Sequence, residues 1–227
     1  MSFGLARGKQ LDTSGVGFTR EDLPPIPGPG APAHAQWIDP RAWFEHPERP
    51  FELEVGSGKG TFLVQQAQLQ PETNFLGIEY AGEFFRYAAD RIRRNAIPNV
   101  KLLYHDATEF IRRVPDEVVT VLHLYFPDPW PKAKHHKRRS LNDAFLEQAH
   151  RILVPRGELR IVTDHPDYWA WMEEHFARWT VGEDARFERL PFTSPDSASE
   201  GEVVGTNFER KYVREGREFN SAVLKKR

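Results

Sequence analysis

The amino-acid sequence predicts an α/β protein with a Rossmann-like, doubly wound and mostly parallel sheet. After Pro50, short apolar runs typical of strands alternate with helical segments. Strands that alternate with helices form parallel sheets covered on both faces, and such sheets bind ligands at the carboxyl ends of their strands. The expected strands are 51–55, 74–79, 100–104, 118–126 and 158–163, and the expected helices are 60–68, 83–95, 108–113 and 142–153.

The composition is that of one soluble globular domain. Hydrophobic residues make up 39% of the 227 residues and charged residues 28%. The longest apolar stretch, 118–126, is interrupted by Thr120 and His123 and is far shorter than the ~18 residues of a membrane span. The lack of cysteine excludes disulfides, thiolate zinc sites and a cysteine nucleophile, and the first nine residues lack the apolar core of a secretory signal. We therefore expect a cytoplasmic protein with no membrane association.

Both ends of the chain depart from the alternating pattern. Residues 1–35 carry prolines among glycines, a composition that disfavours helix and sheet and predicts an extended arm without a fixed fold. The domain itself is expected over residues 36–227. Beyond Asp164 we expect a helix over 168–179, a strand over 187–192, a polar loop over 193–205, a helix from residue 207 and a strand over 219–225.

A glycine-rich turn follows the strand 51–55. The segment Glu54-Val-Gly-Ser-Gly-Lys-Gly60 contains Gly56, Gly58 and Gly60, which let the backbone turn sharply and approach a ligand. A P-loop requires Ser or Thr after the lysine, and a dinucleotide fingerprint requires a glycine at the position of Thr61. The spacing resembles motif I of S-adenosylmethionine (SAM)-dependent methyltransferases, in which the turn wraps the amino acid end of the cofactor. A tight turn without a ligand is the alternative.

Acidic residues stand at the ends of the next two strands. Glu79 ends the strand 74–79, where a carboxylate can accept both ribose hydroxyls of a nucleoside, in NAD sites as in SAM sites. A solvated charge is the alternative at this position. Asp106 follows the strand 100–104 and can accept an adenine amino group, cap the helix that begins near Thr108, or do both. The two acids favour a nucleoside ligand without identifying it.

The fourth expected strand ends in Phe126-Pro-Asp-Pro-Trp-Pro131. Proline fixes its own φ and confines the residue before it, so we expect Asp128 and Trp130 to be held rigidly at the rim of the site. A preorganised acid beside an aromatic ring suits a flat purine, whereas a stiff turn with a solvated Asp128 is the alternative. Because acids now fall at four successive strand ends, we favour a ligand site.

A basic segment, residues 132–139, follows directly. It contains five Lys or Arg, two His and no acid, in a chain whose formal net charge is -2. Such a cluster is a phosphate-binding signature, although basic runs are often only solvated faces or targeting signals. The segment begins two residues after Trp130, and this proximity favours a polynucleotide substrate.

Residues 126–132 together with His135-His-Lys-Arg-Arg139 closely resemble the signature of the bacterial tRNA (guanine-N7-)-methyltransferases. The resemblance extends from about residue 50 to the C-terminus and includes Gly77-Ile-Glu79, Thr163-Asp164 and Thr206-Asn-Phe-Glu209. It implies a class I SAM-dependent methyltransferase over residues 36–227. It further implies that the enzyme transfers the methyl group of SAM to N7 of guanine 46 in the variable loop of its partner, tRNA.

The resemblance also implies roles for single residues. Beside the three glycines of the turn, the cofactor is expected to contact Glu54, Glu79, Asp106 and Asp128, and Asp128 is also the catalytic candidate. The substrate guanine is expected to contact Lys132, Asp164, Thr206, Asn207, Phe208 and Glu209. The RNA is expected to contact Lys134, His135, His136, Lys137, Arg138 and Arg139. The residues themselves allow another interpretation of 206–209, in which Thr206 and Glu209 form a capping box and Gly216 ends the helix.

The chemistry of guanine N7 limits what the enzyme must do. N7 carries an in-plane lone pair and no proton, so its methylation requires alignment rather than a general base. Positive charge develops on the purine, and Asp128, Asp164 and Glu209 are candidates to stabilise it or to accept guanine N1–H and the 2-amino group. No metal is needed, and we expect a monomer or homodimer. The alternatives are a methyltransferase for an exocyclic amino group or a protein side chain, a non-catalytic RNA-binding module and a nicotinamide dehydrogenase.

Overall fold

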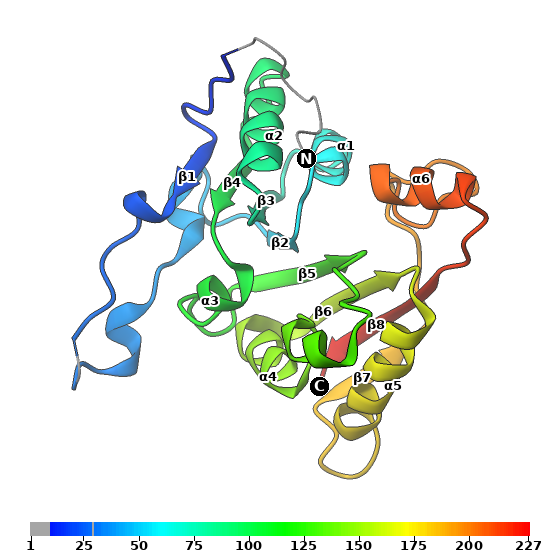
Figure 1. The fold of residues 1–227 in the computed structure, drawn as a ribbon. Coiled ribbons are helices and arrows are strands. Elements are labelled where there is room, and N and C mark those ends of the chain that lie inside the picture. Colours follow the sequence, from blue (N-terminus) through cyan, green and yellow to red (C-terminus); the bar gives the residue numbers. More distant parts are fainter. Residues whose placement is uncertain (1–9, 29) are drawn as a thin grey trace. The chain divides into compact units, whose positions relative to one another are not determined.

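The computed structural model describes residues 10–28 and 30–227 (Figure 1). The chain forms two compact units, residues 1–115 and residues 116–227. Each unit contains strands that alternate with helices, as the sequence predicts. Among the described residues, none of the helices combines the length and the apolar composition needed to cross a membrane.

The first unit contains four parallel strands in the order β1-β4-β3-β2. The strands are β1 Gly17–Thr19, β2 Phe51–Val55, β3 Asn74–Glu79 and β4 Val100–Tyr104, and the helices are α1 Thr61–Leu69, α2 Gly82–Arg94 and α3 Ala107–Ile111. Strands β2, β3 and β4 have the predicted bounds. All six residues of β3 are buried, which is typical of a parallel strand covered on both faces. The carboxyl ends of these parallel strands lie at one edge of the sheet.

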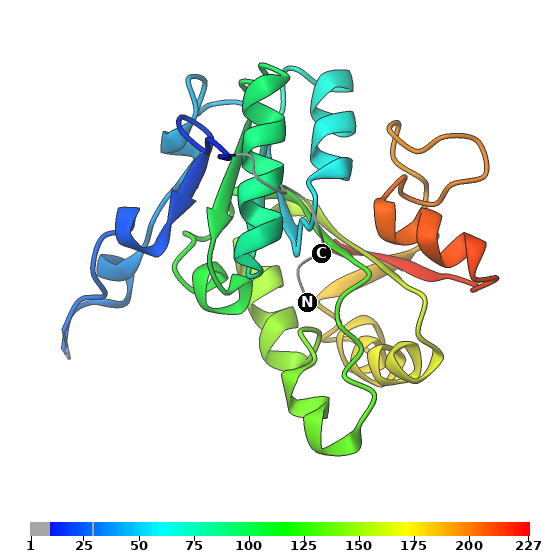
Figure 2. The same ribbon diagram turned by 45° about the horizontal axis from the view of Figure 1, so that its top comes forward.

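Helices α1 and α2 lie side by side on this sheet (Figure 2). Their contact begins at Gly60, where a Cβ atom would lie only 3.1 Å from the Cβ of Ala88. Arg91 of α2 donates a hydrogen bond of 3.1 Å to the hydroxyl of Thr61, the first residue of α1. The glycine that ends the turn after β2 therefore also allows the two helices to approach closely.

The expectation that residues 1–35 have no fixed fold is wrong for part of this arm. Strand β1 pairs in parallel with β4, and the N–H of Leu102 donates to the carbonyl of Val16 at 3.0 Å. Phe18 stacks on Trp43 with ring centroids 4.3 Å apart. Sheet hydrogen bonds and apolar burial therefore outweigh the local preference of the prolines and glycines. Residues 1–9 and Pro29 lie outside the described residues, and the domain boundary at residues 35 and 36 stays a prediction.

The second unit contains strands in the order β5-β6-β8-β7. They are β5 Val119–Tyr125, β6 Leu153–Thr163, β7 Phe187–Leu190 and β8 Asn220–Lys226, and the helices are α4 Asp143–Ile152, α5 Pro166–Thr180 and α6 Asn207–Arg214. β5 and β6 are parallel, whereas β8 runs antiparallel to both β6 and β7. Helices α4 and α5 lie on the same side of these strands in both views (Figures 1 and 2).

Strand β6 begins at Leu153 rather than at residue 158. Its pairing with β5 shifts in register, because Val119 pairs with Leu153 whereas Val121 pairs with Glu158. Pro155 and Gly157 lie in the shifted stretch and interrupt the apolar pattern on which the prediction rested.

Candidate functional site

The turn after β2 has the backbone conformation that its glycines predict. Gly56, Gly58 and Gly60 have φ angles of 75°, 54° and 64°, a region that side chains disfavour. The N–H groups of Gly56 and Ser57 donate to the carbonyl of Ile78 in β3, at 2.8 and 3.2 Å. The turn is therefore held against the end of the neighbouring strand.

Glu79 at the end of β3 is not a solvated charge, because only 8% of the residue is exposed. Its two carboxylate oxygens accept the N–H groups of Gly58 and Ala81, each at 2.7 Å. Glu79 thus fixes the glycine turn relative to the carboxyl end of β3.

Glu54 in β2 has the properties of a ligand-binding acid. The residue is 4% exposed, and its Oε2 has no hydrogen-bond partner among the described residues, as is also true of the Ser57 hydroxyl. Burial, reinforced by the nearby charge of Glu79, raises the pKa of Glu54 to about 8. Buried polar atoms without partners are rare in native proteins. A cation with N–H donors, such as the ammonium group of SAM, fits these two groups.

Asp106 is the N-cap of α3, as one of its two predicted roles requires. Its Oδ1 accepts the N–H of Thr108 at 2.7 Å, the hydroxyl of Thr108 at 2.6 Å and the N–H of Glu109 at 3.3 Å. Within the described part of the chain, every hydrogen bond to this carboxylate goes to Oδ1. Oδ2 therefore remains for the second predicted role.

Asp128 lies in the loop after β5, between two residues whose backbone is strained. Phe126 and Trp130 have φ angles of 51° and 44°, unlike the extended conformation expected before proline. The N–H of Phe126 donates to the carbonyl of Val162 at 2.8 Å, and its ring packs edge-on against Phe219 with centroids 5.3 Å apart. Asp128 itself is exposed. Tertiary contacts therefore impose a conformation that the local sequence disfavours.

One residue of the basic segment, Arg139, is buried, whereas the other basic residues are exposed or half-buried. Residues Ala133–Arg138 form a 3-10 helix, on which Lys134, Lys137 and Arg138 are exposed. Arg138 lies over the ring of Trp130, with its Cζ 4.9 Å from the ring centroid. Lys132 is exposed, and His135 and His136 are half-buried.

Asp164, one of the acids predicted to bind guanine, has an arginine as its partner. The Asp164 side chain is 8% exposed and pairs through Oδ2 with Arg217, a contact that the sequence does not signal. Arg217 in turn lies over Tyr212, with its Cζ 4.2 Å from the ring centroid. The Oδ1 atom of Asp164 has no partner among the described residues.

The capping interpretation of residues 206–209 is correct for Thr206 but not for the side chain of Glu209. Thr206 is the N-cap of α6 and accepts the N–H of Glu209 at 3.1 Å, and Gly216 follows the end of the helix with a φ of 70°. Glu209 is fully buried, but its carboxylate accepts the N–H groups of the loop before Thr206 instead of closing the box. These donors belong to Val203, Val204 and Gly205. Asn207 and Phe208 are exposed on the first turn of α6.

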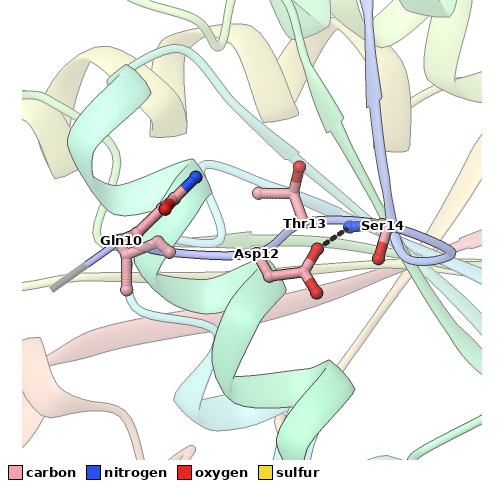
Figure 3. Close-up of a pocket in the computed structure, with 5 residues that line it drawn as sticks. Gln10, Asp12, Thr13 and Ser14 are labelled. Carbon is pink, nitrogen blue, oxygen red and sulfur yellow. Dashed lines mark hydrogen bonds between the residues drawn. The ribbon is translucent and has the colours of Figure 1, made fainter.

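Two further features bear on ligands. Among the described residues there is no group of three or more His, Asp or Glu side chains suited to a metal ion. A surface hollow of about 580 Å³ is lined by residues 10–14, where Asp12 accepts the N–H of Ser14 (Figure 3). This hollow contains none of the predicted site residues.

Comparison with known proteins identifies the family to which the chain belongs. A family described as a putative methyltransferase matches residues 48–222. A tRNA (guanine-N(7)-)-methyltransferase of Nitrobacter hamburgensis is 34% identical over 223 residues, which cover 95% of this chain and 82% of the relative. One from Streptococcus thermophilus is 32% identical over 169 residues, covering 74% of this chain and 77% of the relative.

Solved structures show the same fold at lower sequence identity. The 16S rRNA methyltransferase KamB matches with a TM-score of 0.53 and 15% identity, covering 86% of this chain and 89% of that structure. The aminoglycoside resistance methyltransferase NpmB1 matches with a TM-score of 0.52 and 17% identity, covering 84% of this chain and 95% of that structure.

The family match and the fold together define a class I methyltransferase that uses SAM as its methyl donor. The Rossmann-like, mostly parallel sheet predicted from the sequence is thereby confirmed. The chain belongs to the tRNA (guanine-N(7)-)-methyltransferase family, as the signature around residues 126–139 predicts.

Proposed function

We propose that this enzyme transfers the methyl group of SAM to N7 of a guanine in tRNA, and specifically to guanine 46 of the variable loop. The observation that carries the proposal is the relationship to an enzyme named for guanine N7 of tRNA over 95% of this chain. The exposed basic segment supports a polyanionic substrate. A tRNA substrate also agrees with the cytoplasmic location expected from the sequence.

The cofactor role of the first unit rests on three acids at or near the carboxyl ends of its strands. SAM supplies an electrophilic methyl group on a sulfonium sulfur. Glu54 would accept the cofactor's ammonium group, because its Oε2 is buried without a partner. Glu79, at the end of β3, would accept the ribose hydroxyls, and Asp106 would accept the adenine amino group through Oδ2.

The substrate guanine has two candidate acceptors, and the hydrogen bonds favour Asp164. The Glu209 carboxylate already holds three loop N–H groups, so recognition of guanine by Glu209 would leave buried donors unsatisfied. Asp164 has one oxygen in use, by Arg217, and its other oxygen is available for guanine N1–H or the 2-amino group. Loss of such a paired contact is what lets a site reject adenine.

Asp128 acts in this proposal through charge and position. N7 has no proton to lose, so a carboxylate near the purine is needed only to stabilise the positive charge that develops during transfer. The prolines on both sides of Asp128 reduce the freedom of the loop and so favour a fixed carboxylate. Lys132, which follows this loop, is proposed to contact the guanine nucleotide.

Chemical cleavage at 7-methylguanine tests the reaction and its position together. A tRNA transcript is incubated with enzyme and SAM, reduced, cleaved with aniline and mapped by gel. We expect one new cleavage at guanine 46 and none in a matched transcript with adenine there. Cleavage elsewhere would contradict the position, and methylation without any cleavage would favour an exocyclic amino group or another substrate atom.

The substitution Asp128→Asn tests the role of charge. It preserves size and hydrogen-bonding reach, so we expect SAM affinity to change little and the barrier to transfer to rise by about 2 to 4 kcal/mol. At saturating SAM and tRNA, wild-type single-turnover rates should stay flat from about pH 6 to pH 8, because no base must be deprotonated. A tenfold rise per pH unit across neutrality would show that a general base operates.

A further inference from the structure

Arg139 is the residue of the basic segment that the solvent does not reach. It is 3% exposed, whereas its neighbours Lys137 and Arg138 are exposed. An RNA phosphate cannot contact a guanidinium buried to this degree without rearrangement of the protein. Arg139 therefore requires an explanation other than membership of the RNA-binding run.

The contacts of Arg139 lead to the Asp128 loop. Its Nε donates a hydrogen bond of 2.9 Å to the carbonyl oxygen of Pro129, the residue directly after Asp128. Pro127, Pro129 and Pro131 have no N–H groups, so at these positions the loop cannot donate backbone hydrogen bonds of its own. A donor from outside the loop is therefore needed to fix its backbone, and Arg139 supplies one.

The guanidinium of Arg139 itself lies over two rings of α5. Its Cζ lies 4.9 Å from the ring centroid of Tyr168 and 5.4 Å from that of Trp171. Both rings are fixed through the backbone of Leu141, whose N–H donates to the Tyr168 hydroxyl at 3.0 Å and whose carbonyl accepts from the Trp171 indole at 2.8 Å. Burial raises the pKa of Tyr168 to about 12, so the hydroxyl stays neutral.

Charge neutralisation does not explain this arrangement. None of the ion pairs among residues 10–28 and 30–227 involves Arg139, and its Nη2 is buried without a hydrogen-bond partner. Two aromatic faces stabilise the cation instead. A planar guanidinium can stack on a ring while its edge donates a hydrogen bond, which an ammonium group cannot reproduce. The site thus selects arginine for its geometry.

We propose that Arg139 is a positioning residue for Asp128: it holds the Pro129 carbonyl, and thereby the strained loop that carries the catalytic candidate, rather than contacting RNA. This inference rests on the proposed function for the role of Asp128. The positive φ angles of Phe126 and Trp130 on either side show that the loop requires external contacts to keep its shape.

The neighbouring arginine provides a matched control. Arg139→Lys and Arg138→Lys both keep the charge and every trypsin cleavage site of the segment. For Arg139→Lys we expect the single-turnover rate on saturating tRNA to fall about 10- to 100-fold, the effect of a displacement of about 1 Å at a reacting group. The tRNA dissociation constant and its salt dependence should stay within about twofold of wild type. Because Arg138 belongs to the proposed RNA-binding run, Arg138→Lys serves as the control for the digestion experiment below and not for the rate. The control for the rate is Arg156→Lys, at an exposed arginine near the start of β6 and far along that strand from Asp164, which should keep the wild-type rate.

Limited trypsin digestion reports on the loop without reference to activity. If Arg139 holds the loop, cleavage after Lys132, Lys134 and Lys137 should be at least several-fold faster in Arg139→Lys than in wild type or Arg138→Lys. Thermal unfolding of all three proteins shows whether the difference is local. A wild-type rate in Arg139→Lys, or a loss that appears only as weaker tRNA binding, would overturn the proposal.

The two hypotheses fail in different ways. If wild-type enzyme produces no 7-methylguanine in tRNA, or if Asp128→Asn is fully active, the proposed function or the role of Asp128 is wrong. The digestion experiment still decides whether Arg139 fixes the loop, since unchanged cleavage in Arg139→Lys would overturn that part by itself. Rescue of Arg139→Ala by millimolar guanidinium, but not by ammonium, would support the geometric role.

Discussion

Glu54 should make the binding of SAM release a proton near neutral pH. In the ligand-free protein, burial and the charge of Glu79 raise the pKa of Glu54 to about 8, so the side chain is mostly protonated at pH 7. An ammonium group beside Oε2 would favour the carboxylate and lower this pKa. Binding is therefore coupled to the loss of the proton from Glu54.

The size of the coupling follows from the pKa. With a ligand-free pKa of about 8, roughly 0.9 proton is bound at pH 7, and nearly all of it is released if the pKa in the complex falls below about 5. The SAM dissociation constant should then fall about tenfold between pH 6 and pH 7. Measurements should stay below about pH 7.5, where the amino group of the cofactor is itself protonated.

Glu54 also makes the stability of the ligand-free protein depend on pH. The free energy of unfolding should fall as pH rises, whereas SAM binding becomes stronger. The folded pKa lies above the value of 4.5 from which it is raised, so the stabilising contribution of Glu54 is complete below pH 4.5 and is lost as pH rises towards 8. Between pH 5 and pH 7 this loss amounts to about 3 kcal/mol of unfolding free energy. Glu54→Gln, which cannot ionise, should lack this part of the pH dependence.

Calorimetry in buffers of different ionisation enthalpy measures the released proton directly. We expect about 0.9 proton for wild type and for the control Glu52→Gln on the same strand, and none for Glu54→Gln, which should also bind SAM more weakly. Wild-type binding without proton release at pH 7 would refute the reasoning, because Glu54 would then be ionised before binding or remain neutral in the complex.

Three further predictions concern other parts of the protein. Glu79→Ala should weaken SAM binding while leaving tRNA affinity nearly unchanged, since Glu79 fixes Gly58 in the turn; equal SAM affinity in calorimetry would contradict this. Lys137→Ala combined with Arg138→Ala should reduce the slope of log K against log salt by roughly 0.7 to 0.9 per lost phosphate contact, and an unchanged slope would identify the run as a solvated face. Glu209→Ala should lower the free energy of unfolding by about 3 kcal/mol, against about 1 kcal/mol for Thr206→Ala, because it leaves three N–H groups without their acceptor; similar losses in urea denaturation would count against this.

The sequence predicts well those strands in which apolar residues predominate and turn residues mark the ends. Strands β2, β3 and β4 have the expected bounds because their apolar residues form short runs or alternate with polar ones, and turn residues or acids follow. Strand β1 is missed because three residues in a proline- and glycine-rich arm show no period, and their pairing with β4 depends on residues far along the chain. The start of β6 is missed for a related reason, a register shift that Pro155 and Gly157 accompany.

The features of the candidate site are likewise of two kinds: those that local rules predict and those that depend on tertiary contacts. The glycine turn, the N-cap of Asp106 and the N-cap of Thr206 follow from local rules, and the structure contains all three. The burial of Arg139 and the pairing of Asp164 with Arg217 depend on tertiary contacts, so a linear run of basic residues cannot reveal which cation folds inward. The loop donors that Glu209 holds are another such case.

The strained backbone at Phe126 and Trp130 has a consequence for how the enzyme tolerates change. A loop whose shape is imposed by remote side chains loses that shape when those side chains change, even if its own sequence is intact. Tyr168 and Trp171 lie on α5, some forty residues away in the chain. Substitutions of either residue should therefore slow methyl transfer, as substitutions in the active site do, without weakening tRNA binding. Sequence distance from Asp128 is thus a poor guide to which variants of this enzyme are inactive.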